Sequence, residues 1–281
     1  MKLTKKREQW AQSRKNAKLV GKPLVYPASV SQQYERQLDA LIKRMRKEYE
    51  RDIARLYRDF GALTLDASLA SQARIVLNAL GRRWEQIFNR ASKDIAEGFI
   101  SRLDKFAKRD AARSLEQLSG GLTINVPQWP GDLQDKITAA INSNVALIRN
   151  IPEEYRLRIE GIVNRSIESG QNGSQAVFNE LMRGGEITEK RAKLIATDQT
   201  RKVTSAMATE RMKAAGVERW RWVHSGGGKE PRELHLQLNG KEFRYDEEPP
   251  VIDENGARGY PGQLINCRCV QVPVIDFTND A

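Results

Sequence analysis

The chain has few of the residues from which enzymes and secreted domains build their sites. Two of its 281 residues are cysteine and two are histidine. Two cysteines in a chain of this length do not make a disulfide framework, which indicates a reducing compartment. No run of 18 apolar residues occurs, so no membrane span is predicted. The basic start has no apolar stretch behind it, so we expect no secretory signal.

Positive charge is plentiful but unevenly placed. The net charge is +11, and residues 1–24 hold eight Lys and Arg against one Glu, a net +7. Such a segment attracts phosphate polyanions by displacing condensed counterions. We therefore expect a basic arm over residues 1–28 that contacts DNA, and a solvated tail without a partner is the alternative. The candidate DNA-binding residues are Lys2, Lys5, Lys6, Arg7, Arg14, Lys15, Lys18 and Lys22.

The first half of the chain has the periodicity of long helices. From Ser29 to Gly61 apolar residues recur in steps of three and four, which predicts one amphipathic helix. Its apolar stripe comprises Tyr34, Leu38, Leu41, Met45, Tyr49, Ile53, Leu56 and Phe60. A second such window covers residues 69–118, where Gly81 and Gly98 predict one bent helix or two. A short connection makes residues 29–118 an antiparallel helical hairpin.

The middle of the chain predicts a helical domain over residues 119–215. Ser119-Gly120-Gly121 interrupts the helical pattern, and the alternation in residues 122–126 predicts a short strand. Helical patterns then resume between Pro and Gly positions. The predicted helices cover residues 132–149, 152–169, 174–182 and 188–215.

After Gly216 the pattern changes to strands and turns. Trp220 and Trp222 alternate with polar residues, which predicts a strand. Pro231 predicts the start of a short helix, with a hairpin turning at Asn239-Gly240 as the rival. Further strands are predicted near 243–245 and over 267–274. The sequence thus predicts a mainly α protein of long amphipathic helices with a small C-terminal α+β domain over residues 216–281.

Both cysteines and both histidines fall in this C-terminal domain. On a strand, Cys267 and Cys269 point to one face, and two thiols with one or two imidazoles suit tetrahedral zinc. The candidate ligands are His235, Cys267, Cys269 and His224. Structural zinc sites more commonly use C-x-x-C spacing, so a disulfide and two packed thiols remain open alternatives.

The sequence gives little support for catalysis. A Cys/His pair can act as nucleophile and base, and a metal-dependent nuclease using His235, Cys267 and Cys269 is the enzymatic alternative. The stretch Gly226-Gly227-Gly228-Lys229 lacks the spacing of a phosphate-binding loop. We therefore predict that the protein is not an enzyme.

Several motifs occur in an order that resembles a known family. They are R-A-K-L-I-A-T-D-Q-T-R-K, G-V-E-R-W-R-W, P-R-E-L-H, N-G-K-E-F and Y-P-G-Q-L-I-N-C-R-C. Over residues 187–274 the chain resembles the Mu F-like minor head proteins of tailed bacteriophages. The matching residues are Arg232, His235, Gly240, Pro261, Gly262, Asn266, Cys267, Arg268 and Cys269. The family often has an acidic residue in the loop before P-R-E-L-H, whereas residues 225–229 have none.

The resemblance implies a virion protein present in few copies inside the head, near the portal. It implies association with the portal protein and with capsid or scaffold proteins. It also implies help in head assembly and in DNA packaging or delivery, after assembly in the cytoplasm of the host bacterium. The residues themselves suggest a structural cluster, with zinc as a possible cofactor, more than a catalytic one.

Overall fold

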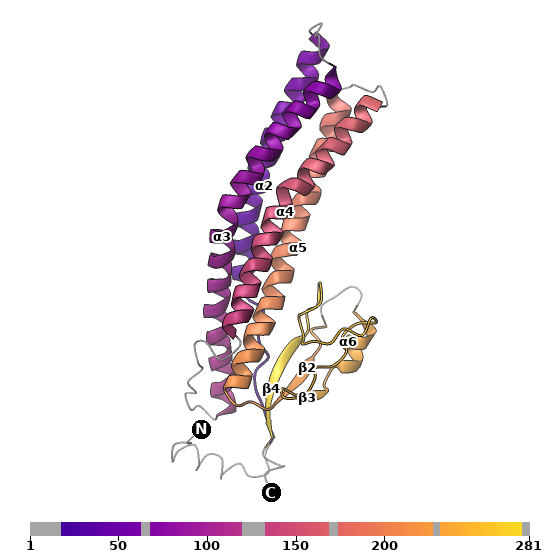
Figure 1. The fold of residues 1–281 in the computed structure, drawn as a ribbon. Helices are drawn as coiled ribbons and strands as arrows, with labels where there is room; N and C mark the ends of the chain where they lie inside the picture. The colour runs from indigo at the N-terminus through magenta and orange to yellow at the C-terminus, as the bar shows by residue number, and fades with distance from the viewer. Residues whose placement is uncertain (1–17, 63–67, 120–132, 169–173, 227–230, 277–281) are drawn as a thin grey trace. The chain divides into compact units, whose positions relative to one another are not determined.

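The computed structural model describes residues 18–62, 68–119, 133–168, 174–226 and 231–276. These ranges confirm a mainly α protein with a small antiparallel sheet near the C-terminus (Figure 1). The helices are α2 (Ala28–Ala62), α3 (Leu69–Leu118), α4 (Leu133–Glu168), α5 (Ser174–Ala214) and α6 (Glu233–Leu238). The strands are β1 (Lys18–Val20), β2 (Arg219–Val223), β3 (Glu242–Arg244) and β4 (Val270–Asp276).

The prediction of separate helices is wrong in two places. The helices predicted over 132–149 and 152–169 form the single helix α4, and those predicted over 174–182 and 188–215 form the single helix α5. Pro152 lies inside α4 and is buried beside Ile151, so packing offsets the loss of one backbone hydrogen bond. Gly184 and Gly185 likewise do not end a helix. A Cβ atom at Gly185 would overlap Cδ of Arg46 in α2, so this glycine leaves room for the Arg46 side chain. The alternative of a single α3 helix is correct.

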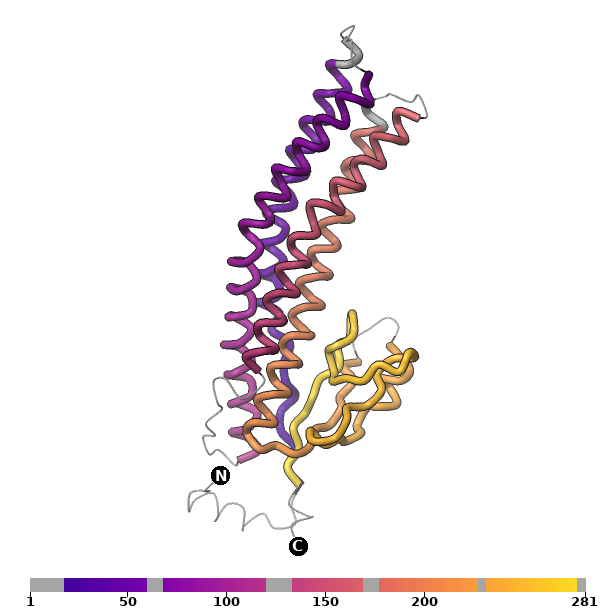
Figure 2. The backbone as a smooth tube through the Cα atoms, in the orientation of Figure 1, coloured from indigo at the N-terminus to yellow at the C-terminus, as the bar shows by residue number. Residues whose placement is uncertain are grey.

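The described residues form two compact units, and the first, the helical unit, comprises Ser31–Phe99 and Ile141–Thr197. In it, segments of the four long helices run side by side (Figure 2). Tyr34 stacks on Phe99 with ring centroids 4.0 Å apart, and its hydroxyl donates to Asn144 Oδ1 at 2.9 Å. Most of the predicted stripe of α2 is buried. Ile42 replaces its neighbour Leu41 on the buried face.

The second unit, the sheet unit, comprises the described parts of Met1–Val30, Ile100–Ala140 and Asp198–Ala281. Its strands are antiparallel in the order β1-β4-β2-β3. Trp220 and Trp222 of β2 are fully buried. They share one core with residues from the ends of α3 and α5, which are Ala111, Leu115, Leu118, Ala208 and Met212.

Part of the predicted basic arm belongs to this sheet. Lys18–Val20 form β1, which pairs with β4, and Lys18 Nζ lies 2.6 Å from a carboxylate oxygen of Glu242. Arg221 binds the same carboxylate at 2.9 Å. Burial raises the pKa of Glu242, but the hydrogen bonds from Lys18 and Arg221 outweigh it and hold that pKa below its ordinary value. Residues 1–17 and the predicted strand at 122–126 lie outside the described residues.

Candidate metal centre and its supporting loop

Three of the four candidate ligands meet in one buried cluster. His235 comes from α6, and Cys267 and Cys269 come from the segment just before β4. Each sulfur lies 3.6 Å from Nδ1 of His235, and the three ligand atoms all lie within 4.8 Å of one another. The residues are only 3%, 3% and 6% exposed, respectively. The strand predicted over 267–274 begins only at Val270, so both cysteines precede it. Their sulfurs nevertheless both face Nδ1 of His235.

The ring of His235 is held in a defined orientation. Its Nε2 lies 3.0 Å from the carbonyl oxygen of Ile252, which can only accept a hydrogen bond. Nε2 therefore carries a proton, and in the neutral ring Nδ1 presents its lone pair to the two sulfurs. The indole of Trp222 packs against the imidazole, with centroids 5.1 Å apart at an angle of 66°.

A tight turn supports Cys267. Gly262 has φ +87°, and its N–H points at Sγ of Cys267 over 3.3 Å. A Cβ atom there would lie 3.6 Å from the carbonyl oxygen of Arg201, but the positive φ alone makes any other residue strained. Asn266 also has a positive φ, of 60°, which asparagine tolerates better than most residues. These conformations give a physical reason for the Pro-Gly and Asn-Cys-Arg-Cys motifs.

The two thiols do not share their protons equally. A hydrogen bond from Cys269 lowers the pKa of Cys267 well below its ordinary value, although burial opposes this. The N–H of Gly262, which points at Sγ of Cys267, also favours the thiolate. The pKa of Cys269 is raised, because its proton bonds to Cys267 and because it is buried.

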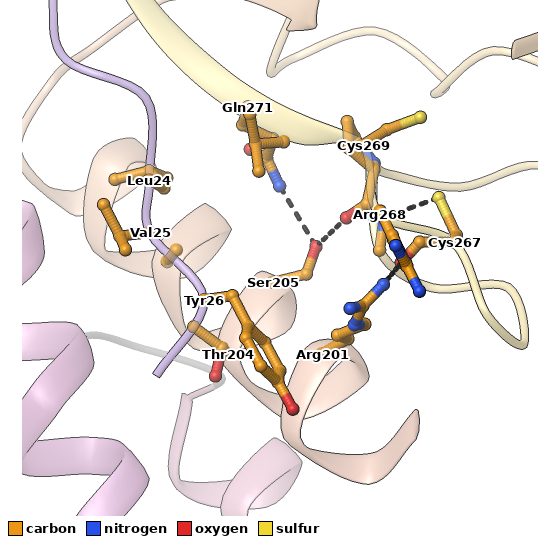
Figure 3. Close-up of a pocket in the computed structure, with 14 residues that line it drawn as sticks. Leu24, Val25, Tyr26, Arg201, Thr204, Ser205, Cys267, Arg268, Cys269 and Gln271 are labelled. Carbon is orange, nitrogen blue, oxygen red and sulfur yellow. Dashed lines mark hydrogen bonds between the residues drawn. The ribbon is translucent and has the colours of Figure 1, made fainter. Parts of the chain in front are cut away.

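Helix α5 anchors this segment from the other side. A guanidinium N–H of Arg201 donates to the carbonyl oxygen of Cys267 at 2.7 Å, and the hydroxyl of Ser205 donates to that of Pro261 at 2.6 Å. Figure 3 shows both side chains reaching from α5 toward the segment that carries the cysteines. Both helix residues therefore position the backbone on which the thiols are mounted.

A small pocket of about 70 Å³ lies along this contact. Arg201 also stacks over the ring of Tyr26 at 4.8 Å. The lining residues are Leu24, Val25, Tyr26, Arg201, Thr204, Ser205, Ala208, Pro261, Gly262, Cys267, Arg268, Cys269, Val270 and Gln271. Sequence reasoning did not single out Tyr26, Arg201 or Ser205. The spacing of four between Arg201 and Ser205 places them on one helix face and was the available indication.

The other predicted residues lie around the cluster. His224 is not in the ligand group, and its Nδ1 accepts the N–H of Gly226 at 3.1 Å. Arg232 precedes α6 and donates to the carbonyl oxygen of Ile265 at 3.0 Å. Gly240, with φ +82°, follows α6, and its N–H donates to the carbonyl oxygen of Trp222 at 2.8 Å. Arg268 is exposed between the two cysteines.

The comparison with known proteins finds a match in this part of the chain. Residues 158–272 match the model of a family described as Phage Mu protein F like protein. This segment resembles the Mu F-like family. The match extends from within α4 through α5, the sheet and the His-Cys cluster, and it confirms the resemblance found in the sequence.

One curated relative is an uncharacterized protein of Haemophilus influenzae, 28% identical over 246 residues. The aligned region covers 86% of this chain and 53% of the relative, so the chain spans about half of that protein's length. No solved structure matches. Among the described residues, no helix is long and apolar enough to cross a membrane.

Proposed function

We propose that the protein is a minor head protein of a tailed bacteriophage. In this role it lies inside the head near the portal, where it aids head assembly and DNA packaging or delivery. The observation that carries the proposal is the Mu F-like match, because it covers the sheet, α6 and the His-Cys cluster.

The proposed partners are the portal protein and capsid or scaffold proteins. Co-expression of the full chain with the portal protein of its own phage tests this directly. We expect the chain to co-purify with assembled portal, also after nuclease treatment that removes bridging DNA. A chain that remains separate from both portal and capsid proteins under these conditions contradicts the proposed partners.

Packaged DNA is the third proposed partner, through the basic arm. Lys18 is paired with Glu242, while Lys22 is exposed. Six of the eight candidate residues, Lys2, Lys5, Lys6, Arg7, Arg14 and Lys15, lie outside the described residues. DNA contact therefore depends mainly on residues 1–17.

Deleting residues 1–17 is expected to weaken DNA binding and to flatten its salt dependence. Six cations that each neutralise a phosphate contribute up to about −5 to the slope of log K against log salt concentration, and the deletion removes this contribution. Fluorescence anisotropy with a short DNA duplex at several salt concentrations measures both effects. The matched control replaces the same six residues by glutamine and keeps the length of the arm. An unchanged slope in both variants contradicts the DNA contact.

The cluster does not favour the nuclease alternative. Among the described residues, no carboxylate joins His235, Cys267 and Cys269, and all three are buried. Equal inertness of the wild type and of His235→Ala toward DNA removes this alternative. Metal-dependent cleavage that disappears in His235→Ala overturns the non-enzymatic role.

A further inference from the structure

We propose that Cys267, Cys269 and Nδ1 of His235 bind a zinc ion that fastens the loop-rich segment before β4 to α6. This site does not depend on the proposed head-protein role. The proposal rests on the ligand geometry, on the orientation of the imidazole and on the small number of backbone pairings in the segment between β3 and β4.

Both sulfur–nitrogen distances in the cluster are those of a zinc site. Zinc binds sulfur at about 2.3 Å and nitrogen at about 2.0–2.1 Å, so a tetrahedral site places these atoms about 3.6 Å apart. Both sulfurs lie 3.6 Å from Nδ1 of His235. The two thiolates and the divalent ion are together neutral, which suits a cluster that is nearly inaccessible to solvent.

Packing of two free thiols explains the arrangement less well. Because Nε2 of His235 donates to the Ile252 carbonyl, neutral Nδ1 has one lone pair and can accept one proton. Both sulfurs nevertheless converge on that nitrogen at equal distance. A cation between the three atoms uses both sulfur–nitrogen contacts. Hydrogen bonding uses one of them at most, and the proton of Cys269 then points at Cys267 and leaves the contact between Cys269 and Nδ1 without a role.

The surroundings have the features that support metal ligands. A histidine ligand usually donates its second N–H to a carbonyl or carboxylate, as His235 does to Ile252. The N–H of Gly262 points at Sγ of Cys267, which favours an anionic sulfur. Arg201 and Ser205 fix the backbone of the same segment from α5. Helix α5 and the carbonyl of Ile252 thus orient Cys267 and His235, two of the three ligands.

The backbone around the cluster has little regular structure of its own. Between β3 and β4 the structure has one isolated bridge, from Val251 to Arg258. A segment with so few backbone pairings gains most from a bond that closes it onto a helix. Zinc with three protein ligands also keeps one position for water or an outside ligand.

Metal content of the full chain, produced without a polyhistidine tag, tests the proposal. We expect about one zinc per chain in the wild type and in the control His224→Gln, because His224 is outside the ligand group. Cys267→Ser, Cys269→Ser and His235→Gln should each lose most of it. Cobalt added to the chelated wild type should produce thiolate-to-cobalt charge-transfer absorption.

The wild type alone can overturn the proposal, so the test remains decisive even if a ligand variant fails to fold. Wild-type protein that binds neither zinc nor cobalt contradicts the site, whether its thiols are free or joined in a disulfide. Zinc retained by a folded triple ligand variant shows adventitious binding and contradicts it as well. Hydrogen exchange adds a local readout: chelation should speed exchange in residues 245–269 but not in the helical unit.

Discussion

An Asp104→Ala variant is expected to lose about 3–5 kcal/mol of its free energy of unfolding. Arg211 of α5 is fully buried, and its guanidinium is paired with the carboxylate of Asp104 in α3. Its Nε and Nη1 atoms have no hydrogen-bond partner among the described residues. Removing Asp104 therefore leaves a buried cation without its counter-charge, and desolvation of that cation is no longer compensated.

Urea unfolding followed by tryptophan fluorescence measures the loss. The matched control is the double variant Asp104→Leu, Arg211→Met, which removes both charges and keeps apolar volume. We expect it to be much closer to the wild type, because no unpaired charge remains. A single Asp104→Ala variant that unfolds within about 0.5 kcal/mol of the wild type contradicts the buried pair.

Trp222→Ala is expected to cost about 3–5 kcal/mol as well, for a different reason. Trp222 is fully buried at the centre of the sheet unit, beside Trp220 and against the ring of His235. Truncation loses the transfer free energy of the indole and leaves a cavity that the sheet and α6 can fill only in part.

The matched control is Ile265→Ala, a truncation of a side chain that is 53% exposed in the same unit. Its loss should stay within about 0.5 kcal/mol, because little apolar area returns to water. Denaturant unfolding of both variants gives the comparison. Similar losses for Trp222→Ala and Ile265→Ala contradict the assignment of Trp222 to the core.

Periodicity predicted the helices well where one face is buried along its whole length. The bounds expected for α2 and α3 agree closely with Ala28–Ala62 and Leu69–Leu118. Periodicity failed to predict helix continuity where one residue type is compatible with two structures. Gly185 is typical of a helix end, yet its missing side chain accommodates Arg46 of another helix. Such a contact between distant segments leaves no local pattern in the sequence.

The same limit applies to the sheet and the site. Lys18–Val20 is too short to show a strand pattern, and it forms β1 only because β4 offers a partner. The candidate ligands could be predicted because the chain has only two histidines and two cysteines, all in one region, so few ligand sets were possible. Sequence did not show that His224 stays outside the group or that Arg201 and Ser205 support the cysteine segment. Those facts depend on tertiary contacts.

Quantitative mass spectrometry of purified phage particles tests whether this chain is a head protein. Particles that carry this chain should be separated from free protein by density, and intact heads compared with tails. We expect peptides of this chain in the head fraction, in a few copies for each portal. Its absence from heads in which the portal and capsid proteins are readily detected contradicts the proposed role as a head protein.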